Sequence, residues 1–233
     1  MSIFNGQNED NHWFSIADLM SVLMLIYIFI SVIYIIKITH EKNRIEKIAV
    51  SYNQLQYELY KDLESEFKDD LKKWNAVLDQ STLSVRFEEP IIFFNRGSAT
   101  LKEEFKVILN DFFPRYLKIL TSDKYRDDVE EIRIEGHTSS EWAENLSKDE
   151  IYLKNMELSQ DRTRNVLAYL LEHQQNNEQL ALILPKITTN GLSSSKLIMK
   201  NGLEDKEASR RVEFRVRTNA EKQITRILTI PSN

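Results

Sequence analysis

One long apolar stretch near the N-terminus constrains this chain more than any other feature of its sequence. Residues 14–36 contain a single formally charged side chain, Asp18, and residues 22–36 carry no charge at all. At a rise of about 1.5 Å per residue, a helix of this length crosses a hydrocarbon core of about 30 Å. We therefore predict one transmembrane helix over residues 13–37, preceded by a short N-terminal segment, residues 1–12.

Asp18 is the residue of this helix that needs a functional explanation. An ionised carboxylate inside a membrane costs about 2.5–3.5 kcal/mol or more unless it is paired, protonated or in contact with water. Ser15 and Ser21, three residues to either side, place hydroxyl groups on the same helical face. One interpretation is a headgroup-level carboxylate that complements the helix dipole, with Trp13 as an interfacial anchor. The other is a carboxylate that takes up and releases an ion within a membrane complex.

The residues around Asp18 favour the second interpretation. Residues 13–20 resemble the start of the single helix of MotB-type stator B subunits, in which Trp precedes a short apolar-Ala-Asp-apolar-Met segment. The resemblance implies that Asp18 carries the ion, H+ in preference to Na+, with Ser15 and Ser21 in support. It also implies two kinds of partner, a second copy of this chain and a pentamer of MotA-like A subunits that surrounds the B dimer. No other cofactor is expected.

Length and composition exclude several classes of protein. The 233 residues leave room for one ordinary domain of about 100–150 residues besides the membrane helix and a connector. The chain has no cysteine, which excludes disulfides and thiolate metal sites. A net charge of -5 without a long basic cluster argues against direct binding of nucleic acid. The apolar run is too long for a cleavable signal peptide and lacks a basic segment before it.

A second apolar pattern follows the membrane segment over residues 38–80. Apolar side chains recur there at spacings of three and four residues, at Ile45, Ile48, Tyr52, Leu55, Leu59, Leu63, Phe67, Leu71, Trp74 and Leu78. This pattern predicts a long amphipathic helix whose apolar stripe needs a partner. We interpret it as a dimeric helical stalk, although the spacing departs from a clean heptad. The alternative is a helix that folds back on its own domain. Nothing in residues 38–80 distinguishes a stalk from a plug that gates ion flow.

The periodicity changes at residue 81. Residues 83–87, 130–137 and 211–217 alternate like strands, and residues 184–189 are expected to form a further strand. Residues 91–94 are a short apolar run, and residues 101–120 and 153–172 have helical spacing. This order predicts an α+β domain over residues 81–219, with helices packed on a small mixed sheet and a C-terminal tail at 220–233.

Four segments of this domain occur in the order of known signatures. Residues 92–101, 134–138, 155–162 and 209–214 resemble the successive motifs of the OmpA-like peptidoglycan-binding domain. The resemblance implies a mixed-sheet α/β sandwich that holds the diaminopimelate of a wall peptide. It implies that Arg162 clamps a carboxylate of that ligand, because a guanidinium offers a planar fork of donors. Asn155 and Leu158 match the residues that line the pocket.

One position of the pocket departs from the family. Ser139 follows the Gly-His-Thr motif where the family usually has Asp, so a charge that normally faces the ligand is missing. Either Glu141 replaces it as a displaced acid, or the ligand is a different element of the wall. His137, in the same motif, is interpreted as a structural residue, since no catalytic set or metal-ligand cluster is expected around it.

The orientation of the chain rests on two conflicting signals. Residues 1–12 contain no Lys or Arg, whereas Lys37, Lys42, Arg44 and Lys47 follow the apolar run, so the positive-inside rule favours a cytoplasmic C-terminus. The family resemblance implies the reverse. We follow the resemblance and expect a single-pass protein of the bacterial inner membrane, with a cytoplasmic N-terminus and a periplasmic C-terminal domain.

Together these features indicate an ion-conducting, wall-anchored B subunit of a rotary motor rather than an enzyme. Residues 206–213 and the short N-terminus resemble the B subunit of Zorya anti-phage defence motors. Two alternatives remain open from the sequence. One is a flagellar stator B subunit, which keeps the chemistry and changes the downstream partner. The other is a structural wall tether, which makes no use of Asp18.

Overall fold

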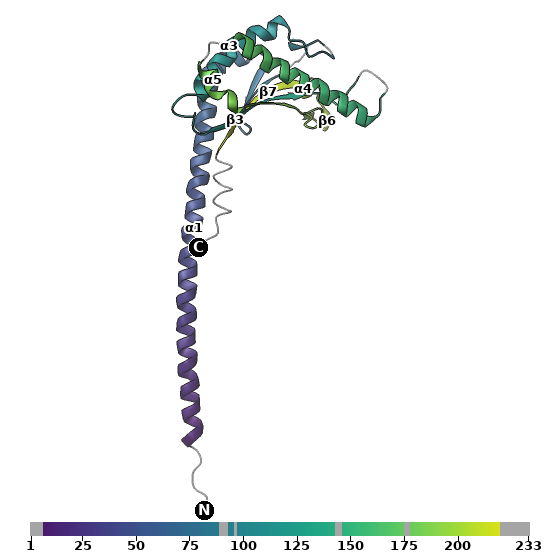
Figure 1. The fold of residues 1–233 in the computed structure, drawn as a ribbon. Helices are drawn as coiled ribbons and strands as arrows, with labels where there is room; N and C mark the ends of the chain where they lie inside the picture. The colour runs from purple at the N-terminus through teal and green to yellow at the C-terminus, as the bar shows by residue number, and fades with distance from the viewer. Residues whose placement is uncertain (1–6, 89–92, 96, 143–145, 175–177, 220–233) are drawn as a thin grey trace, which may run out of the picture. The chain divides into compact units, whose positions relative to one another are not determined.

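The chain forms two compact units, Met1–Ser51 and Tyr52–Asn233, which we describe separately. The long helix α1, Gln7–Leu71, contributes to both. The computed structural model describes residues 7–88, 93–95, 97–142, 146–174 and 178–219 (Figure 1).

In the first unit, α1 carries the apolar stretch that the sequence marks as a membrane span. Residues Trp13–Glu46 are long and apolar enough to cross a membrane, judged by length and composition. None of the most apolar window is buried within the chain, and large side chains such as Phe29 are 70% exposed. A helix that is apolar all round and unburied needs lipid or protein partners to cover it.

The second unit is an α+β domain, as the sequence predicts. Its described elements after α1 are, in chain order, β1 (Ala76–Asp79), β2 (Ser84–Phe87), α3 (Glu103–Leu120), β3 (Val129–His137), α4 (Lys148–His173), α5 (Glu178–Ile183), the 3-10 turn η1 (Leu184–Lys186), β4 (Ile187–Gly191), β5 (Met199–Lys200), β6 (Leu203–Glu204), α6 (Lys206–Ser209) and β7 (Arg211–Thr218).

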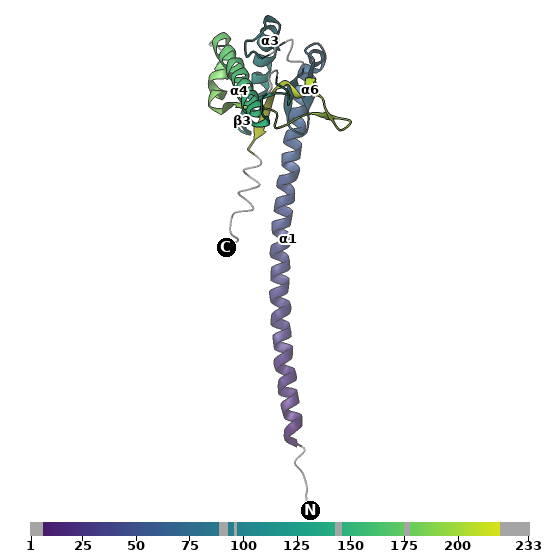
Figure 2. The ribbon, with the colours of Figure 1, turned by 90° about the vertical axis from the view of Figure 1, so that its right-hand side faces the viewer.

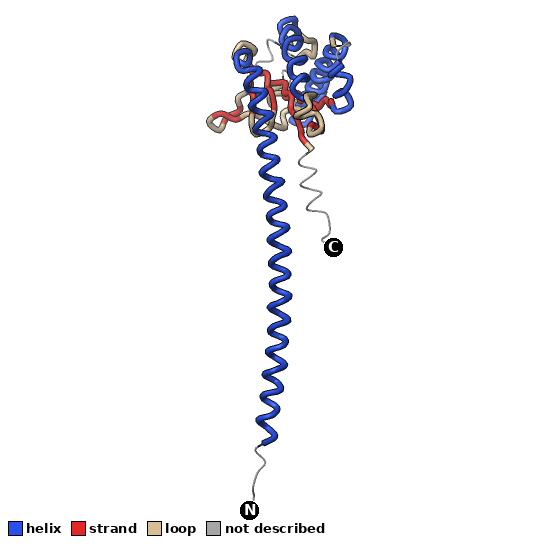
Figure 3. Tube along the Cα trace, turned by 90° about the vertical axis from the view of Figure 1, so that its left-hand side faces the viewer, coloured by secondary structure: helices blue, strands red, loops and turns tan. Residues whose placement is uncertain are grey.

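Five of the strands form one mixed sheet in the order β1-β2-β7-β3-β4. β3 and β4 are parallel, and the other neighbours are antiparallel. Helices α3 and α4 lie against the same face of the sheet (Figure 1 and Figure 2), and the tube view shows helices gathered beside the red strands (Figure 3). Along β3, buried Ile132 and Ile134 alternate with Arg133 and Glu135, so one face of the strand is apolar and the other is charged.

Aromatic side chains fill the space between the sheet and α3. The ring of Phe214 on β7 lies 5.9 Å from that of Phe87 on β2 and 5.1 Å from that of Phe112 on α3. All three side chains are fully buried. Aromatic pairs at these separations add to the gain from burial, so they form the centre of the domain core.

We expect Phe112→Ala to lower the free energy of unfolding by about 3–5 kcal/mol, because the cavity left by a buried ring cannot fully collapse. Chemical denaturation of the purified chain would measure the change. Val107→Ala, on the same helix but at a position that is 68% exposed, is the matched control and should change stability by less than about 0.5 kcal/mol. Equal effects of the two substitutions would contradict this description of the core.

The C-terminal turns of α1 belong to this core, which differs from the expected stalk over residues 38–80. Leu59, Leu63 and Phe67 are fully buried within the second unit. Polar contacts add to the packing, since Arg115 of α3 donates to the Glu66 carboxylate at 2.7 Å and Tyr125 donates to Asp62 at 2.6 Å. The compact unit therefore begins before residue 81.

The reason for this difference lies in what covers the apolar stripe. From Leu59 onward the stripe packs into the core of the same chain, where the Phe67 ring lies 5.1 Å from the Phe112 ring of α3. This is the alternative that the sequence left open. Residues 76–79, expected within the stalk, form the edge strand β1. A dimer contact through the stripe is thus restricted to the part of α1 that precedes Leu59.

Other boundaries shift for local reasons. α4 begins at Lys148 rather than near residue 153, because Ser147 and Glu150 form a reciprocal capping box. β4 begins at Ile187 because a 3-10 turn that contains Pro185 precedes it. The short apolar run at residues 91–94 lies partly outside the described residues, and Phe94 forms an isolated bridge with Leu101.

Candidate functional site

Two glycines bring α4 unusually close to the sheet and thereby fix the helix that carries the predicted pocket residues. A Cβ on Gly136 of β3 would lie 2.6 Å from the carbonyl oxygen of Ser159, and one on Gly191 of β4 would lie 2.4 Å from the amide nitrogen of Gln160. The Gly191 amide also donates to the Gln160 side chain at 2.7 Å. Because only glycine permits this approach, α4 is held rigidly against the ends of β3 and β4.

Arg162 on α4 is a buried cation without a carboxylate partner in the described part of the chain. Its side chain is 5% exposed, its Nε donates to the carbonyl oxygen of Ser98 at 3.0 Å, and its guanidinium lies 4.8 Å from the ring centroid of Phe94. Burial, together with the positive charge of Arg210, lowers the pKa of Arg162 to about 10. A buried guanidinium that no internal acid neutralises is suited to receive an anion from outside.

Asn155 lies two helical turns before Arg162 and holds the loop that carries Ser139. Its amide donates to the carbonyl oxygens of Ser139 at 3.2 Å and of Glu141 at 3.4 Å. Asn155 and Ser139 are both buried, whereas Leu158 is half-buried. The structure therefore brings Asn155 and Ser139 together, and it gives Asn155 a positioning contact with the loop.

Charged contacts tie the same loop to the segment before β7. The Ser140 amide donates to the Glu204 carboxylate at 2.9 Å, and Glu141 forms an ion pair with Lys206. The Glu141 carboxylate thus already has a cationic partner within the chain. This arrangement argues against Glu141 as a substitute for the acid that Ser139 replaces.

Asp18 lies in the other unit, on the exposed surface of α1. The Ser21 hydroxyl donates to the carbonyl oxygen of Ala17 at 2.7 Å, so its proton is engaged by the helix backbone. Its oxygen lone pairs remain available on that surface. A supporting role of Ser15 and Ser21 beside Asp18 stays a prediction.

Three residues around Arg162 were not among the sequence-based candidates. Phe94 and Ser98 lie within the first OmpA-like signature, and Arg210 lies within the last, so their positions in the motifs were the available signal. Only the tertiary structure shows that these signatures meet at the Arg162 side chain.

A mixed sheet, a helical layer and a buried arginine on the helix after β3 together define an OmpA-type domain. Residues 93–211 match the model of the OmpA family. A solved MotB-like protein from Desulfovibrio vulgaris has a similar fold, with a TM-score of 0.50 and 21% identity over 71% of this chain and 96% of that structure.

More than nine tenths of the chain is matched by a more specific group of relatives. It is 45% identical over 224 residues to the Zorya protein ZorB of Escherichia coli strain Crooks, which covers 95% of this chain and 94% of that protein. It is 29% identical over 218 residues to a second Escherichia coli Zorya protein ZorB, covering 91% of this chain and 82% of that protein. The chain therefore belongs to the Zorya ZorB family, as the sequence motifs predicted.

Proposed function

We propose that this chain is the ion-conducting, wall-anchored B subunit of an inner-membrane rotary motor that serves anti-phage defence. The observation that carries the proposal is Asp18, the only charged side chain within residues 14–36 of a helix that is apolar and unburied. A membrane anchor needs no acid at this position, whereas an ion carrier does. Membership of the Zorya ZorB family and the resemblance to MotB-type subunits support this reading.

The anchor of the proposed motor is the Arg162 pocket. A guanidinium that is 5% exposed and without an internal acid among the described residues fits the carboxylate of a peptidoglycan peptide, the ligand that the OmpA-like motifs imply. Leu158 and Ser139 are the further positions that the OmpA-like motifs assign to ligand contact. Because position 139 is Ser and not an acid, recognition of the ligand depends mainly on the contact between Arg162 and the ligand carboxylate.

In the proposed mechanism, ions reach Asp18 from one side of the membrane and leave it on the other. Protonation neutralises the carboxylate and changes its preferred contact on a surrounding pentamer of A subunits. The ring steps around a B dimer that peptidoglycan holds still. One charge that crosses 100 mV supplies about 2.3 kcal/mol, so each turn consumes many protons. This mechanism requires a cytoplasmic N-terminus and a periplasmic domain.

A helix replacement separates the motor from a structural tether. We expect that replacing residues 14–36 with an uncharged Leu-Ala helix of equal length preserves membrane insertion and abolishes protection against phage. Plating efficiency in cells that also express the adjacent A-type subunit measures protection, and membrane fractionation measures insertion. A second replacement that keeps residues 13–21 native is the matched control and should retain more protection. Full protection with the uncharged helix would favour the tether.

A further inference from the structure

A cluster of buried ionisable side chains lies on the charged face of the sheet, apart from the Arg162 pocket. Glu135 and His137 are two residues apart on β3 and therefore share a face, and the register of β7 places Glu213 directly opposite Glu135. All three residues are at most 5% exposed. The sequence indicated no metal-ligand cluster around His137, because only strand pairing brings the distant Glu213 to it.

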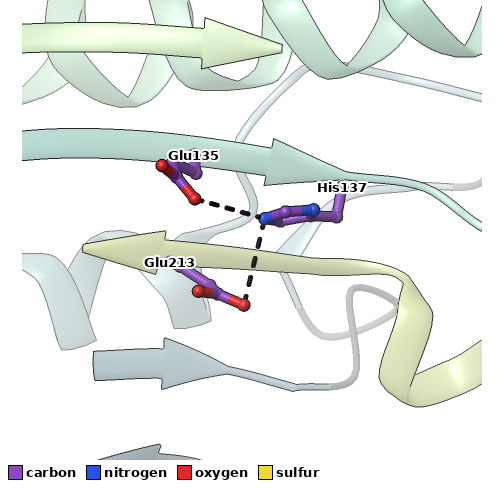
Figure 4. Close-up of side chains that lie close together, drawn as sticks. All are labelled: Glu135, His137 and Glu213. Atoms are coloured by element: carbon purple, nitrogen blue, oxygen red, sulfur yellow. Dashed lines mark ion pairs between the residues drawn. The ribbon is translucent and has the colours of Figure 1, made fainter. Parts of the chain in front are cut away.

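The geometry of this cluster leaves a gap between its members. His137 Nε2 lies 3.8 Å from Glu135 Oε2 and 3.9 Å from Glu213 Oε1, too far for a hydrogen bond (Figure 4). Neither ring nitrogen of His137 has a hydrogen-bond partner within the described residues. The three candidate ligand atoms all lie within 4.8 Å of one another.

The two carboxylates of the cluster are not equally satisfied. Glu213 Oε1 accepts hydrogen bonds from Arg211 Nε at 2.5 Å and from Arg86 Nε at 3.1 Å. Glu135 accepts none within the part of the chain that the structure describes, and its nearest cation, Arg133, is 3.9 Å away. A buried carboxylate without a hydrogen bond, beside a buried imidazole without one, is an incomplete polar network.

A divalent cation would complete this network. One imidazole nitrogen and two carboxylate oxygens are a ligand set that suits zinc and other first-row divalent ions. Ligand bonds of about 2.0–2.2 Å place tetrahedral donor atoms about 3.4 Å apart. The gaps of 3.8 and 3.9 Å from His137 would therefore need to close by about 0.5 Å, and the separation of the two carboxylate oxygens, which is at most 4.8 Å, by up to about 1.4 Å. Side-chain rotation alone can supply a movement of this size.

We propose that Glu135, His137 and Glu213 form a binding site for a divalent transition-metal ion, with zinc as the reference ion. The site crosslinks β3 and β7 at the centre of the sheet, so metal binding would stabilise the domain. The guanidinium groups of Arg211 and Arg86 oppose the added positive charge and thus limit the affinity. The proposal is independent of the motor function, since it involves neither Asp18 nor Arg162.

Zinc titration of the full chain in detergent, after removal of metal with EDTA, tests the proposal. We expect one zinc per chain by calorimetry and a rise in Tm of about 5 °C or more at zinc concentrations 100-fold above Kd. Glu135→Gln and His137→Gln should each weaken binding by more than about 100-fold, because even outer-shell partners contribute 10–100-fold. His173→Gln is the matched control, since His173 lies on α4 and contacts the carbonyl oxygen of Tyr169 instead.

Several outcomes would overturn the site. They are the absence of saturable zinc binding, binding that persists in both Glu135→Gln and His137→Gln, and a Tm that zinc leaves unchanged. Absence of saturable zinc binding would indicate that a buried water molecule fills the space between the three side chains. Arg86→Gln adds a test that does not remove a ligand, because loss of one opposing charge should tighten zinc binding. Circular dichroism of each variant establishes that it is folded, and weaker binding by a folded Arg86→Gln chain would also contradict the proposal.

Discussion

Asp18→Asn is expected to abolish ion flow and phage protection while leaving expression and assembly intact. The amide has nearly the same size as the carboxylic acid but cannot release a proton, so the cycle of charging and neutralisation stops. Removal of a potential charge from the apolar span also lowers the cost of membrane insertion, so the variant should reach the membrane at least as well. Proton flux into vesicles that contain both subunits, together with plating efficiency, measures the effect.

Two further substitutions at the same helix sharpen this test. Asp18→Glu keeps a titratable carboxyl and should retain part of the ion flow, whereas Asp18→Asn should retain none. Ser21→Ala should have a small effect, because the Ser21 hydroxyl already donates to the Ala17 carbonyl oxygen. If Asp18→Asn protects against phage as well as the native chain does, the motor mechanism is excluded. The structural wall tether would then be the better interpretation.

Arg162→Met is expected to weaken binding to purified peptidoglycan by about 10–100-fold, since hydrogen bonds to charged groups contribute about 1.5–3 kcal/mol. Methionine keeps an unbranched apolar stem beside Phe94 and removes only the charged fork. A sedimentation assay with the detergent-solubilised chain and intact sacculi measures binding. Because the anchor holds the B subunit still, phage protection should be lost as well.

The stability of the same variant distinguishes a binding role from a structural one. Burial lowers the pKa of Arg162 to about 10, which means that the folded chain holds this charge less favourably than water does. Arg162→Met should therefore unfold at the same temperature as the native chain or a higher one. Arg164→Met is the matched control, because Arg164 is 70% exposed on the same helix and pairs with Asp161. A large loss of stability with unchanged wall binding would make Arg162 a structural residue.

The sequence was informative wherever a pattern is local. The apolar run around Asp18 follows from composition, the strands at residues 130–137 and 211–217 follow from alternation, and the family follows from four ordered motifs. The Ser147–Glu150 capping box was also readable, and it would have placed the start of α4 correctly. These features depend on neighbours within a few residues, so the amino-acid sequence alone contains them.

Contacts between distant residues could not be read in the same way. The amphipathic stripe that contains Leu63 required a partner, but an identical stripe can face a second chain or its own domain, and only the fold shows α3 against it. Asn155 was a candidate for ligand contact, and only the fold shows that its amide also holds the loop at Ser139.

The sequence by itself determined the apolar helix long enough to cross a membrane, the single acid within its residues 14–36, the α+β class and the family of this protein. Tertiary structure decided that the end of α1 belongs to the domain core, that Arg162 is buried without an internal acid among the described residues, and that Glu213 lies opposite Glu135 beside His137. The physical reason is the range of the interactions. Periodicity and motifs are properties of adjacent residues, whereas burial and charge pairing depend on strand register and on which surfaces meet when the chain folds.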